Sequence, residues 1–548
     1  MNWGKERKQF VLPTLGDEIE LQEKALKQRF LKPFFTNLDR DVYAITGNLP
    51  AVLAAVLVAR QSRAETRDAR ELLWEEFTQI DEFLAGEKAA KKIKNIIDGF
   101  GDDSVREQAS AYMMLQNMSV LATTFGVTHP LLTRIEASTR YINWSKKEKG
   151  KYLFKELDFG SDEAAKEVYQ ETMERCFGTY GELWQPVWDY VVVNNPREEG
   201  VSEAAHLTSV RGKVCDNLRG LLPLAALTNF GLHGDFRSFS ELVMNLRAAD
   251  NEEMRQMGDQ MYEELAKVNP EFIVVANNEH GRAWTEYKRA MNYRLRKEQA
   301  LERLIPAEED GSKVDVASSS VNFLFEVARA YLASFSPAVD EESLTEGALT
   351  MANSGEMAEL LVDIGKMRKN RRHELPDFLR EITVNVKFRD VSFGTLKDLF
   401  RHRRILWRSQ GDFSGQRGNH IPRDIEAIGG VVLLRYQGAC DDAAEAVDWM
   451  YGRGNSEAAN YLLIHGMKTS FEIKCDLVEA YWISELRSMA SGFEEYRWVA
   501  QKLWRKLLIE LPELELLGSF TNMTESYPLG RIKEAVRADL ANRGGMLV

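Results

Sequence analysis

The chain has 548 residues, of which 44% are apolar and 28% are charged, and it carries a formal net charge of -13 at pH 7. This balance is typical of a folded globular protein, and it argues against a disordered chain or a general nucleic-acid binder, whose domain is usually basic. No apolar run reaches the roughly 18 residues of a membrane span, and the start of the chain lacks the apolar core of a secretory signal. We therefore expect a cytoplasmic protein without membrane association.

Cysteine spacing and the common ligand-binding motifs argue against several site classes. The cysteines at 176, 215, 440 and 475 show no C-x-x-C spacing, so we expect buried, reduced thiols rather than a zinc site or a disulfide framework. The segment Gly99-Phe-Gly101 lacks the third glycine of a dinucleotide loop, and the chain has no G-x-x-x-x-G-K-[ST] sequence. We predict neither a Rossmann nor a P-loop enzyme, and no metal site.

Hydrophobic periodicity predicts helices at the start of the chain and strands after them. Residues 1–40 are predicted to be an N-terminal extension that ends in an amphipathic helix at about 21–35, and a longer helix follows near 51–77. Apolar and polar side chains then alternate over 109–116, which predicts a half-buried strand, and 187–193 is a second candidate strand. Helix and strand patterns of this kind favour an α/β or α+β fold.

Two further helical patterns precede the middle of the chain. Asp235 or Ser238 is placed to cap a helix that runs through Leu246 and Arg247. An apolar stripe at helical spacing continues beyond it, and we interpret the stripe as core packing rather than as a cofactor site: Met254, Met257, Met261 and Leu265.

The second half repeats the order of the first. A polar, turn-rich segment at 305–320 is predicted to be a linker. Beyond it, a helix at 356–367 precedes an alternating strand at 382–388, a basic stretch and a final helical region. The order of helix, strand, polar motif and helix thus occurs twice, which indicates two copies of one unit. We assign the first copy to 41–304 and the second copy to 321–548.

The basic stretch is Phe400-Arg401-His402-Arg403-Arg404, at the end of a segment in which residues 366–408 hold thirteen Lys or Arg against five Asp or Glu. Arginine offers a planar fork of donors that suits phosphate and pyrophosphate, and histidine can exchange a proton near neutral pH. Taken alone, the stretch is more typical of a solvated helix face or a patch that binds nucleic acid than of a ligand pocket.

Arg401-His402-Arg403, together with the strand before it, resembles the R-H-R-x-x-S-x-N-E-x-S-x-R signature of the flavin-dependent thymidylate synthases. Glu381 stands at the distance of the glutamate that precedes this signature, and 409–417 looks like its stretched ending. The segment 373–376 is similar to the family's histidine-containing turn before the strand. Asp398 departs from the family, which usually places there a glutamine that touches the base.

The first half resembles the same family with complementary losses. The segment 128–141 fits the signature frame without a gap and keeps His129, Glu136, Ser138 and Arg140, but it lacks both arginines that flank the histidine. Further along, residues 219–223, which begin with Arg219, and residues 235–238 resemble two arginine-containing elements of the family. The second of these elements is followed by Arg247. The second copy has the following residues at the matching places: Asn460, Asp476 and Arg487.

The resemblance implies an enzyme in which FAD carries hydride from NADPH, and methylene-tetrahydrofolate supplies the carbon that converts dUMP to dTMP. It implies no side-chain nucleophile, so the expected working groups are arginines that hold phosphates and a developing uracil anion. Because the family forms homotetramers with shared sites, a fused pair of copies implies a homodimer that acts as a pseudo-tetramer.

The resemblance also assigns roles to single residues. The implied substrate-binding positions are Glu136, Ser138, Arg140, Arg219 and Arg487. The implied cofactor-binding positions are Arg401, His402, Arg403, Asp235 and Arg237. The implied catalytic positions are Arg247 and Arg487. We expect the residues kept by the two copies to meet at a pseudo-symmetric interface and to form one kind of working site.

Other interpretations of the same residues stay open. A helix cap and an ion pair would explain Glu136, Ser138 and Arg140, and surface ion pairs would explain Arg219 and Arg247. The rival functions are alkylation of another pyrimidine nucleotide and non-catalytic binding of a nucleotide or flavin. A nucleic-acid patch at the basic stretch is a further rival, and it predicts binding that falls steeply with salt.

Overall fold

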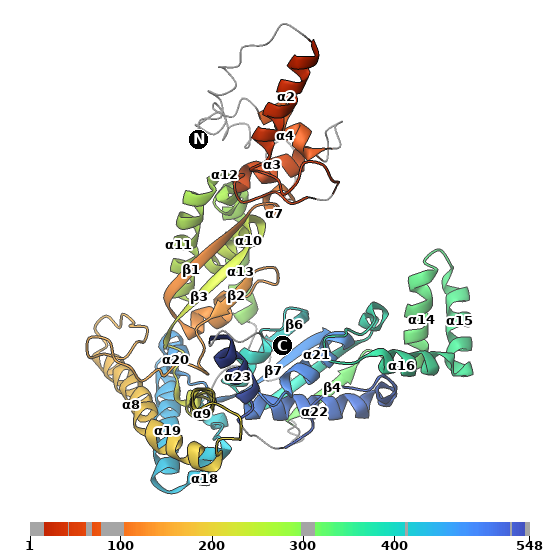
Figure 1. Cartoon of the computed structure of the whole chain (residues 1–548). Coiled ribbons are helices and arrows are strands. Elements are labelled where there is room, and N and C mark those ends of the chain that lie inside the picture. The colour runs from red at the N-terminus through yellow and green to blue at the C-terminus, as the bar shows by residue number, and fades with distance from the viewer. Residues whose placement is uncertain are drawn as a thin grey trace. The chain divides into compact units, whose positions relative to one another are not determined.

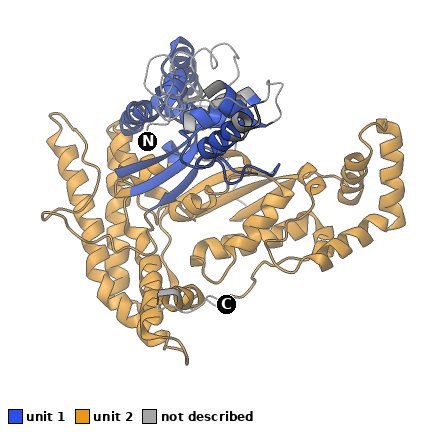
Figure 2. Cartoon of the chain, turned by 45° about the horizontal axis from the view of Figure 1, so that its top comes forward, with its two compact units in different colours: residues 1–116, 125–136, 229–305 blue, residues 117–124, 137–228, 306–548 orange. Residues whose placement is uncertain are grey.

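The computed structural model describes residues 16–41, 43–61, 68–77, 104–297, 313–410, 415–525 and 529–542. The chain divides into two compact units, which Figure 2 shows in different colours. Unit 1 comprises residues 1–116, 125–136 and 229–305, and unit 2 comprises residues 117–124, 137–228 and 306–548. The units are interleaved along the chain, so their bounds differ from those predicted for the two sequence copies.

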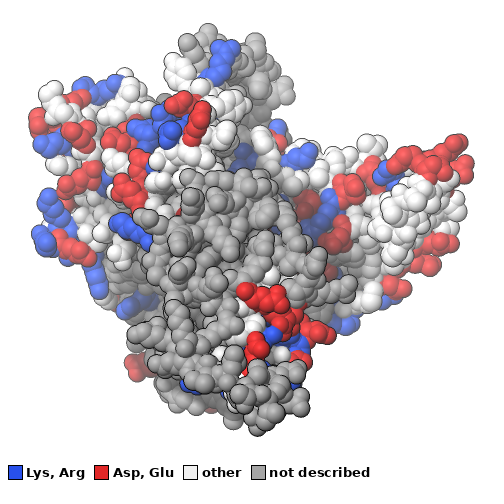
Figure 3. Space-filling model, turned by 90° about the horizontal axis from the view of Figure 1, so that it is seen from above, with Lys and Arg blue, Asp and Glu red and all other residues white. Residues whose placement is uncertain are grey.

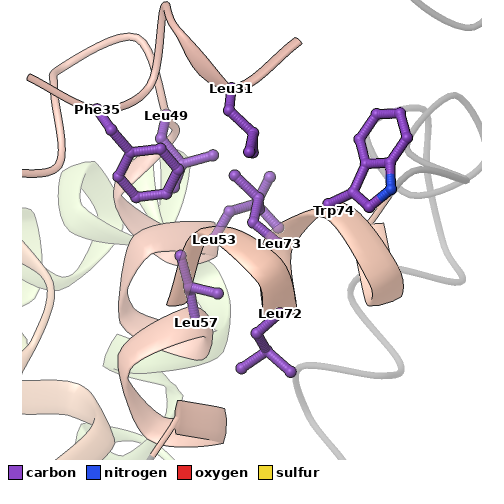
Figure 4. Packing of buried hydrophobic residues seen from close by; sticks show 8 residues of the cluster. All are labelled: Leu31, Phe35, Leu49, Leu53, Leu57, Leu72, Leu73 and Trp74. Carbon is purple, nitrogen blue, oxygen red and sulfur yellow. The ribbon is translucent and has the colours of Figure 1, made fainter. Parts of the chain in front are cut away.

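The N-terminal helices of unit 1 pack around one apolar cluster. These helices are α2 (Gly16–Leu31), α3 (Ala51–Gln61) and α4 (Ala69–Phe77), labelled in Figure 1. Figure 4 shows the cluster, which consists of Leu31, Phe35, Leu49, Leu53, Leu57, Leu72, Leu73 and Trp74. The helix predicted at 21–35 begins earlier and ends at Leu31, while the pattern at 51–77 forms two helices, and 62–67 lie outside the described residues.

A three-stranded sheet and its helices make up the rest of unit 1. The strand order is β1 (Ser110–Ser119), β3 (Leu227–Asp235) and β2 (Thr133–Glu136), and β2 pairs with β3 in antiparallel register. Strand β1 confirms the alternation predicted at 109–116. The π-helical turn after β1 is η1 (Ala122–Gly126), of which residues 122–124 are assigned to unit 2. The remaining helices are α7 (Ser104–Glu107), α10 (Phe236–Arg247), α11 (Glu252–Val268), α12 (Pro270–Ile273), η3 (Val274–Ala276) and α13 (Glu279–Lys297).

Two predictions about the helices of unit 1 are confirmed. Asp235 is the N-cap of α10, and its carboxylate accepts a hydrogen bond from the backbone N–H of Ser238 at 2.8 Å. The apolar stripe of α11 is buried, as expected for core packing, and consists of Met254, Met257, Met261 and Leu265.

Unit 2 contains a four-stranded antiparallel sheet, in the order β4 (Val314–Ser318), β5 (Thr383–Ser392), β7 (Lys468–Asp476) and β6 (Ile405–Gln410). Strand β5 confirms the strand predicted at 382–388, and α16 (Glu356–Met367) confirms the helix predicted at 356–367. The linker predicted at 305–320 is wrong for its last residues, because Val314 and Val316 alternate with polar residues and pair with β5.

Helices surround this sheet and extend beyond it. The longer ones are α8 (Glu163–Asn194), α9 (Glu203–Leu218), α14 (Phe323–Phe335), α15 (Glu341–Ser354), α19 (Gly430–Gly452), α21 (Leu477–Arg487), α22 (Glu494–Glu510) and α23 (Ile532–Asn542). The shorter ones are η2 (Arg219–Leu221), η5 (Asp377–Glu381), α17 (Phe393–Leu399), η6 (Gly415–Arg417), α18 (Arg423–Ile428), α20 (Ser456–Leu462) and η7 (Pro512–Leu517). The strand predicted at 187–193 is wrong, since these residues belong to α8. Valines favour strands locally, but Val187 and Val191 are buried one helical turn apart, so tertiary packing decides the outcome.

Two corresponding segments of the sequence copies pair with each other in unit 2, with Pro223 bridged to Ile464 at the centre. The backbone N–H of Leu224, the residue after Pro223, donates to the carbonyl oxygen of Leu463, the residue before Ile464, at 2.7 Å. In return, the N–H of His465 donates to the carbonyl oxygen of the residue before Pro223 at 3.0 Å. This reciprocity is what a two-fold axis produces at an isologous contact, so the copies meet pseudo-symmetrically here.

The expected combination of helices and sheets is confirmed, and α+β is the more specific description because each strand pairing with a described register is antiparallel. Among the described residues, no helix combines the length and apolarity needed to cross a membrane. The four cysteines are free and buried, as expected. Burial raises the pKa of Cys176 to about 12, so this thiol stays protonated and unreactive.

Candidate functional site

A buried ion pair joins the two copies where the paired segments begin. Arg219 forms the first residue of η2, and its Nη1 and Nη2 each donate to Oδ2 of Asp398, near the end of α17, at 3.1 Å. The guanidinium group also lies 4.1 Å from the ring centre of Phe493, and Arg219 is only 3% exposed. The sequence copies therefore share a charge pair that is removed from water.

Four guanidinium groups act on the carboxylate of Asp398. Burial alone would raise its pKa, but the charges of Arg219, Arg401, Arg487 and Arg140, in that order of influence, hold the pKa well below its usual range. Asp398 is therefore an anion throughout the physiological range, and an ionised carboxylate can only accept hydrogen bonds.

A second ion pair fixes Arg140 to Asp216, which lies in α9. Nε and Nη2 of Arg140 donate to the two carboxylate oxygens at 2.6 Å each. The backbone N–H of Arg140 donates to the hydroxyl of Ser138 at 3.1 Å, so Ser138 stabilises the turn that carries the arginine. Burial opposes the ionisation of Asp216, but the nearby Arg140 guanidinium lowers the pKa of this carboxyl below its usual value. Both members of the pair are consequently charged.

Tyr496, in α22, contacts one arginine from each copy. Its Oη accepts a hydrogen bond from Nη1 of Arg140 at 2.8 Å. Its ring centre lies 5.6 Å from the guanidinium carbon of Arg140 and 5.6 Å from that of Arg487, within the range of a cation–π interaction. Arg140 of the first copy and Arg487 of the second copy thus meet at one side chain within a single chain.

His402 is held at both ring nitrogens. Nε of Arg487 donates to its Nε2 at 3.0 Å, and its Nδ1 lies 2.6 Å from Oε1 of Glu479. An arginine can only donate, so Nε2 is unprotonated and the proton resides on Nδ1, which donates to Glu479. Burial lowers the pKa of His402, which agrees with this neutral form. The imidazole therefore links a carboxylate to Arg487 and fixes the direction of that arginine.

A pocket of about 560 Å³ opens beside His402 in unit 2. We call it the arginine pocket, because its lining includes Arg368, Arg371, Arg372, Arg401, Arg403, Arg404 and Arg487. Arg368 is neutralised by Glu485, with two hydrogen bonds of 2.8 and 3.1 Å. Arg403, by contrast, is exposed and makes no ion pair with any described residue. An excess of guanidinium groups over their carboxylate partners suits an anionic ligand.

The distribution of surface charge bears on whether the protein resembles a nucleic-acid binder. On the face that Figure 3 shows, acidic and basic side chains of the described residues are interspersed, and the basic ones do not gather into one field. A concave pocket with several arginines is a different feature from the broad basic stripe that is typical of nucleic-acid binders.

Four of the predicted site residues belong to unit 1, and three of them have contacts there that a structural role would explain. Glu136 ends β2, and Asp235 caps α10. Arg237 pairs with Glu107 at 2.5 Å and with Glu241 at 3.3 Å. A structural role would explain these contacts of Asp235 and Arg237, and the functional roles of the three residues stay predictions.

Arg247 is the fourth of these residues. Its Nε donates to Oδ1 of Asp259 at 2.7 Å, and its Nη1 donates to the carbonyl oxygen of Ala276 at 3.1 Å. The guanidinium carbon lies 4.7 Å from the ring centre of Tyr262. The arginine holds α10 to its neighbours, and its catalytic role also stays a prediction.

Sequence reasoning missed the residues that position the arginines of unit 2: Asp216, Glu479, Tyr496 and Arg531. Nη1 of Arg531 donates to the carbonyl oxygen of Arg140 at 3.2 Å, and its Nη2 lies 3.7 Å from Asp216. No local motif marks these residues, because each acts on a partner that is distant in sequence. Within the stretched signature ending at 409–417, residues 411–414 lie outside the described part of the chain.

The neutral state of His402 gives a testable pH dependence. Its pKa in the folded protein lies below the unfolded value of about 6.5, so the unfolded chain takes up this proton first as the pH falls. The stabilising contribution is complete above pH of about 6.5 and is lost as the pH falls through the folded pKa. We expect the stability difference between wild type and His402→Gln to shrink as the pH is lowered below about 6.5, as measured by urea denaturation. A difference that grows instead would mean that an imidazolium pairs with Glu479 in the folded protein.

Comparisons with known proteins agree with the tandem arrangement. The model of the family described as thymidylate synthase complementing protein matches residues 47–271 and 325–513, one segment in each predicted copy. The predicted family resemblance is thereby confirmed.

Two relatives and one solved structure place the chain among known proteins. The UPF0159 protein of Chlamydia pneumoniae is 29% identical over 544 residues, which cover 96% of this chain and 99% of that protein. The UPF0159 protein Ta1429 of Thermoplasma acidophilum is 27% identical over 520 residues, which cover 89% and 99%. A crystal structure of thymidylate synthase X (ThyX) from Helicobacter pylori with FAD and dUMP covers 38% of this chain and 100% of its own, at 16% identity and a TM-score of 0.27.

Proposed function

The chain belongs to the thymidylate synthase complementing protein family, and from this premise we propose that it is a flavin-dependent thymidylate synthase. The proposed reaction converts dUMP to dTMP with FAD, NADPH and methylene-tetrahydrofolate. The observation that carries the proposal is the convergence of Arg140, Arg219 and Arg487 on one buried cluster of unit 2, although Arg140 and its partner Tyr496 are 356 positions apart. Arginines assembled from distant segments around shared partners are what a site for phosphate-bearing ligands requires.

The arginine pocket fits the anionic part of FAD. Arg401 and Arg403 line it beside His402, and their guanidinium forks can pair with pyrophosphate oxygens. Trp482 also lines the pocket and offers an aromatic face for a ring system. When bound, FAD supplies hydride transfer, and the role of the chain is to bind and orient it.

The nucleotide is assigned to the buried arginines next to this pocket. We propose that Ser138, Arg140 and Arg219 position its phosphate, and that Arg487 stabilises the negative charge that develops on the uracil ring. Arg487 is suited to this role because His402 holds its Nε, which leaves the direction of the guanidinium group fixed. For Glu136, and for the unit 1 residues Asp235, Arg237 and Arg247, the roles implied by the resemblance are retained as part of the proposal.

One observation favours a second candidate, the alkylation of another pyrimidine nucleotide. Asp398 stands where the family usually has a glutamine that touches the base, and it is ionised. A glutamine amide can both donate and accept, as uracil requires, whereas a carboxylate only accepts and would favour a base with an amino group. Moreover, Asp216 and Asp398 already accept hydrogen bonds from the two arginines assigned to the phosphate. Because these two carboxylates already neutralise the arginines, non-catalytic binding of a nucleotide or flavin is the third candidate.

We further propose that two chains form a homodimer that acts as a pseudo-tetramer in the cytoplasm. The reciprocal pairing at Pro223 and Ile464 supports one pseudo-two-fold contact within the chain. A second, true two-fold contact between chains would complete an arrangement of four copies. The molar mass of the purified protein in solution tests this part directly.

Purified protein with bound flavin is expected to be yellow, to oxidise NADPH faster with dUMP, and to form dTMP when methylene-tetrahydrofolate is added. A colourless protein that takes up no FAD would exclude both enzyme candidates. A yellow protein that does not respond to dUMP but responds to a cytosine nucleotide would support the second candidate, and one that responds to no pyrimidine nucleotide would support the third.

A matched pair of variants tests the assignment of the arginine pocket. Arg403→Ala is expected to raise the Kd for FAD at least about tenfold, because it removes a charge-assisted hydrogen bond to the ligand. Arg505→Ala is the control, since Arg505 is also exposed, lies in α22 and does not line the pocket. Equal effects of the two substitutions in fluorescence titrations of FAD would contradict the assignment.

A further inference from the structure

A second hollow of about 920 Å³ lies in unit 2 and has no role in the proposed chemistry so far. We call it the tail pocket, because residues 529–530 and the first turns of α23 form one of its walls. The other walls are residues 195, 196 and 198, His206 in the first turn of α9, residues 370–372, and the loop 489–491. Its volume is in the range of pockets that hold nucleotide-sized molecules.

The lining of the tail pocket is rich in basic groups: His206, Arg371, Arg372, Lys533 and Arg537. Two acidic residues, Glu198 and Glu534, also line it. Within the described part of the chain, none of these side chains forms an ion pair, so the basic groups keep a positive excess. Charged groups that line a hollow without compensating one another are available to a ligand of opposite charge.

One buried atom in this lining lacks a hydrogen-bond partner. Nε of Arg371, a half-buried residue, is itself buried and finds no partner among the described residues. His206 lies beside it in the lining and is 6% exposed. A buried polar atom that stays unsatisfied costs free energy, and Nε of Arg371 therefore points to a ligand that completes it.

The wall made by the tail is firmly attached. Arg531 donates to the carbonyl oxygen of Arg140 at 3.2 Å and lies 4.5 Å from the ring centre of Tyr141. A Cβ at Gly530 would lie 1.7 Å from the carbonyl oxygen of Ala490, so only glycine permits this close approach. The matched family segments end at residue 513, so this wall is an addition to the part of the chain that the family model matches.

We propose that the tail pocket is a second anion site, which binds the phosphate-bearing end of a nucleotide cosubstrate. It shares Arg371 and Arg372 with the arginine pocket, so ligands of the two pockets would be neighbours. Arginine forks, a lysine and the N-terminal end of α23 are donors that suit a phosphate ester. The reduced nicotinamide dinucleotide phosphate is the cosubstrate with that chemistry. Its assignment rests on the proposed function, whereas anion binding by the tail pocket does not.

The test uses the full chain and adenosine 2′,5′-bisphosphate as the probe, with affinity measured by isothermal titration calorimetry. Lys533→Glu combined with Arg537→Glu is expected to weaken binding of the probe at least about a hundredfold, because it replaces two attractive charges by repulsive ones. Both positions are exposed on α23, so the substitutions leave the core intact. Arg505→Glu is the control, since Arg505 is exposed on α22 and lines neither pocket, and binding is expected to stay within about twofold.

Each outcome decides for or against the tail pocket. Wild-type protein that does not bind the probe, or a control variant that loses binding equally, would overturn the anion site. Displacement of the probe by a tetrahydrofolate pentaglutamate but not by NADPH would overturn the assignment to a phosphate ester. Failure of the proposed function is distinguishable, because a chain that binds the probe in the tail pocket but takes up no FAD keeps the anion site and loses the thymidylate synthase proposal.

Discussion

Replacing Asp398 by alanine is expected to lower the free energy of unfolding by about 3 to 5 kcal/mol, because it leaves Arg219 as an uncompensated buried charge. The two side chains are 4% and 11% exposed, and both donors of the guanidinium group that face Asp398 lose their acceptor. Three further arginines that act on Asp398 would also repel one another without it. Urea denaturation followed by circular dichroism measures the change.

Two further variants show whether the loss comes from the buried pair. Asp442→Ala removes the partner of Arg175 in a pair whose side chains are about half exposed, and it is expected to cost less than about 1 kcal/mol. Arg219→Met combined with Asp398→Ala removes both charges, and the double variant is expected to be more stable than Asp398→Ala alone. If Asp398→Ala costs no more than Asp442→Ala, the pair has no special place in the stability of unit 2.

The same variant should acquire a response to anions. Inorganic pyrophosphate is expected to stabilise Asp398→Ala more than the wild type, because the vacated position is surrounded by arginines that an anion can neutralise. Such a result would mean that Asp398 acts as an internal counter-ion at a position that a phosphate group can occupy. An equal response of the two proteins would place the binding of pyrophosphate elsewhere, for example in the arginine pocket.

Local patterns in the sequence predicted the elements whose burial follows a simple period. The alternation at 109–116 and at 382–388 predicts β1 and β5, and the cap of α10 is one of the two predicted candidates, Asp235 rather than Ser238, because each depends on residues close in sequence. The strand predicted from the valine run at 187–193 is wrong, because its structure depends on residues far away in sequence. Its strand propensity is local, but its helix is stabilised by packing against α19, far along the chain.

The interleaving of the units lay beyond any local pattern. A repeat in the sequence predicts two copies, each expected to form its own compact unit. Residues 137–228 of the first copy instead belong to the same compact unit as residues 306–548. The physical reason is the reciprocal pairing around Pro223 and Ile464, together with the packing of α8 on α19. Copies that bury their faces against each other cannot also be separate compact bodies.

For the candidate site, the resemblance supplied the arginines but not what positions them. Arg140, Arg219 and Arg487 are positions that the resemblance implies, whereas Asp216 and Tyr496 are visible only in the fold. An acidic or aromatic residue inside a helix carries no local sign that it will meet an arginine hundreds of positions away. Departures from the family pattern are more informative, since Asp398 was noticed as a substitution and proves to be the counter-ion of Arg219.

Mixing inactive chains is expected to restore no activity if the working site lies within one chain. Arg140→Ala and Arg487→Ala should each lower kcat/KM for dTMP formation at least about a hundredfold, as expected for the loss of one charged group that stabilises developing charge. Both arginines contact the same Tyr496, so every site in a mixed dimer would lack one of them. The variants are co-expressed with different tags, and the mixed dimers are isolated and assayed.

A site shared between the two chains predicts a different activity for the mixed dimer. If a working site combined Arg140 of one chain with Arg487 of its partner, a mixed dimer would hold one intact site and one doubly damaged site. Its activity would recover to about half that of the wild type. Mixed dimers of wild type with either variant provide the control, because they retain half of the activity under both arrangements. Since Arg140 and Arg487 flank one ring in a single chain, with 5.6 Å from each guanidinium carbon to the ring centre, recovery in the variant–variant dimer would require the site to lie away from Tyr496.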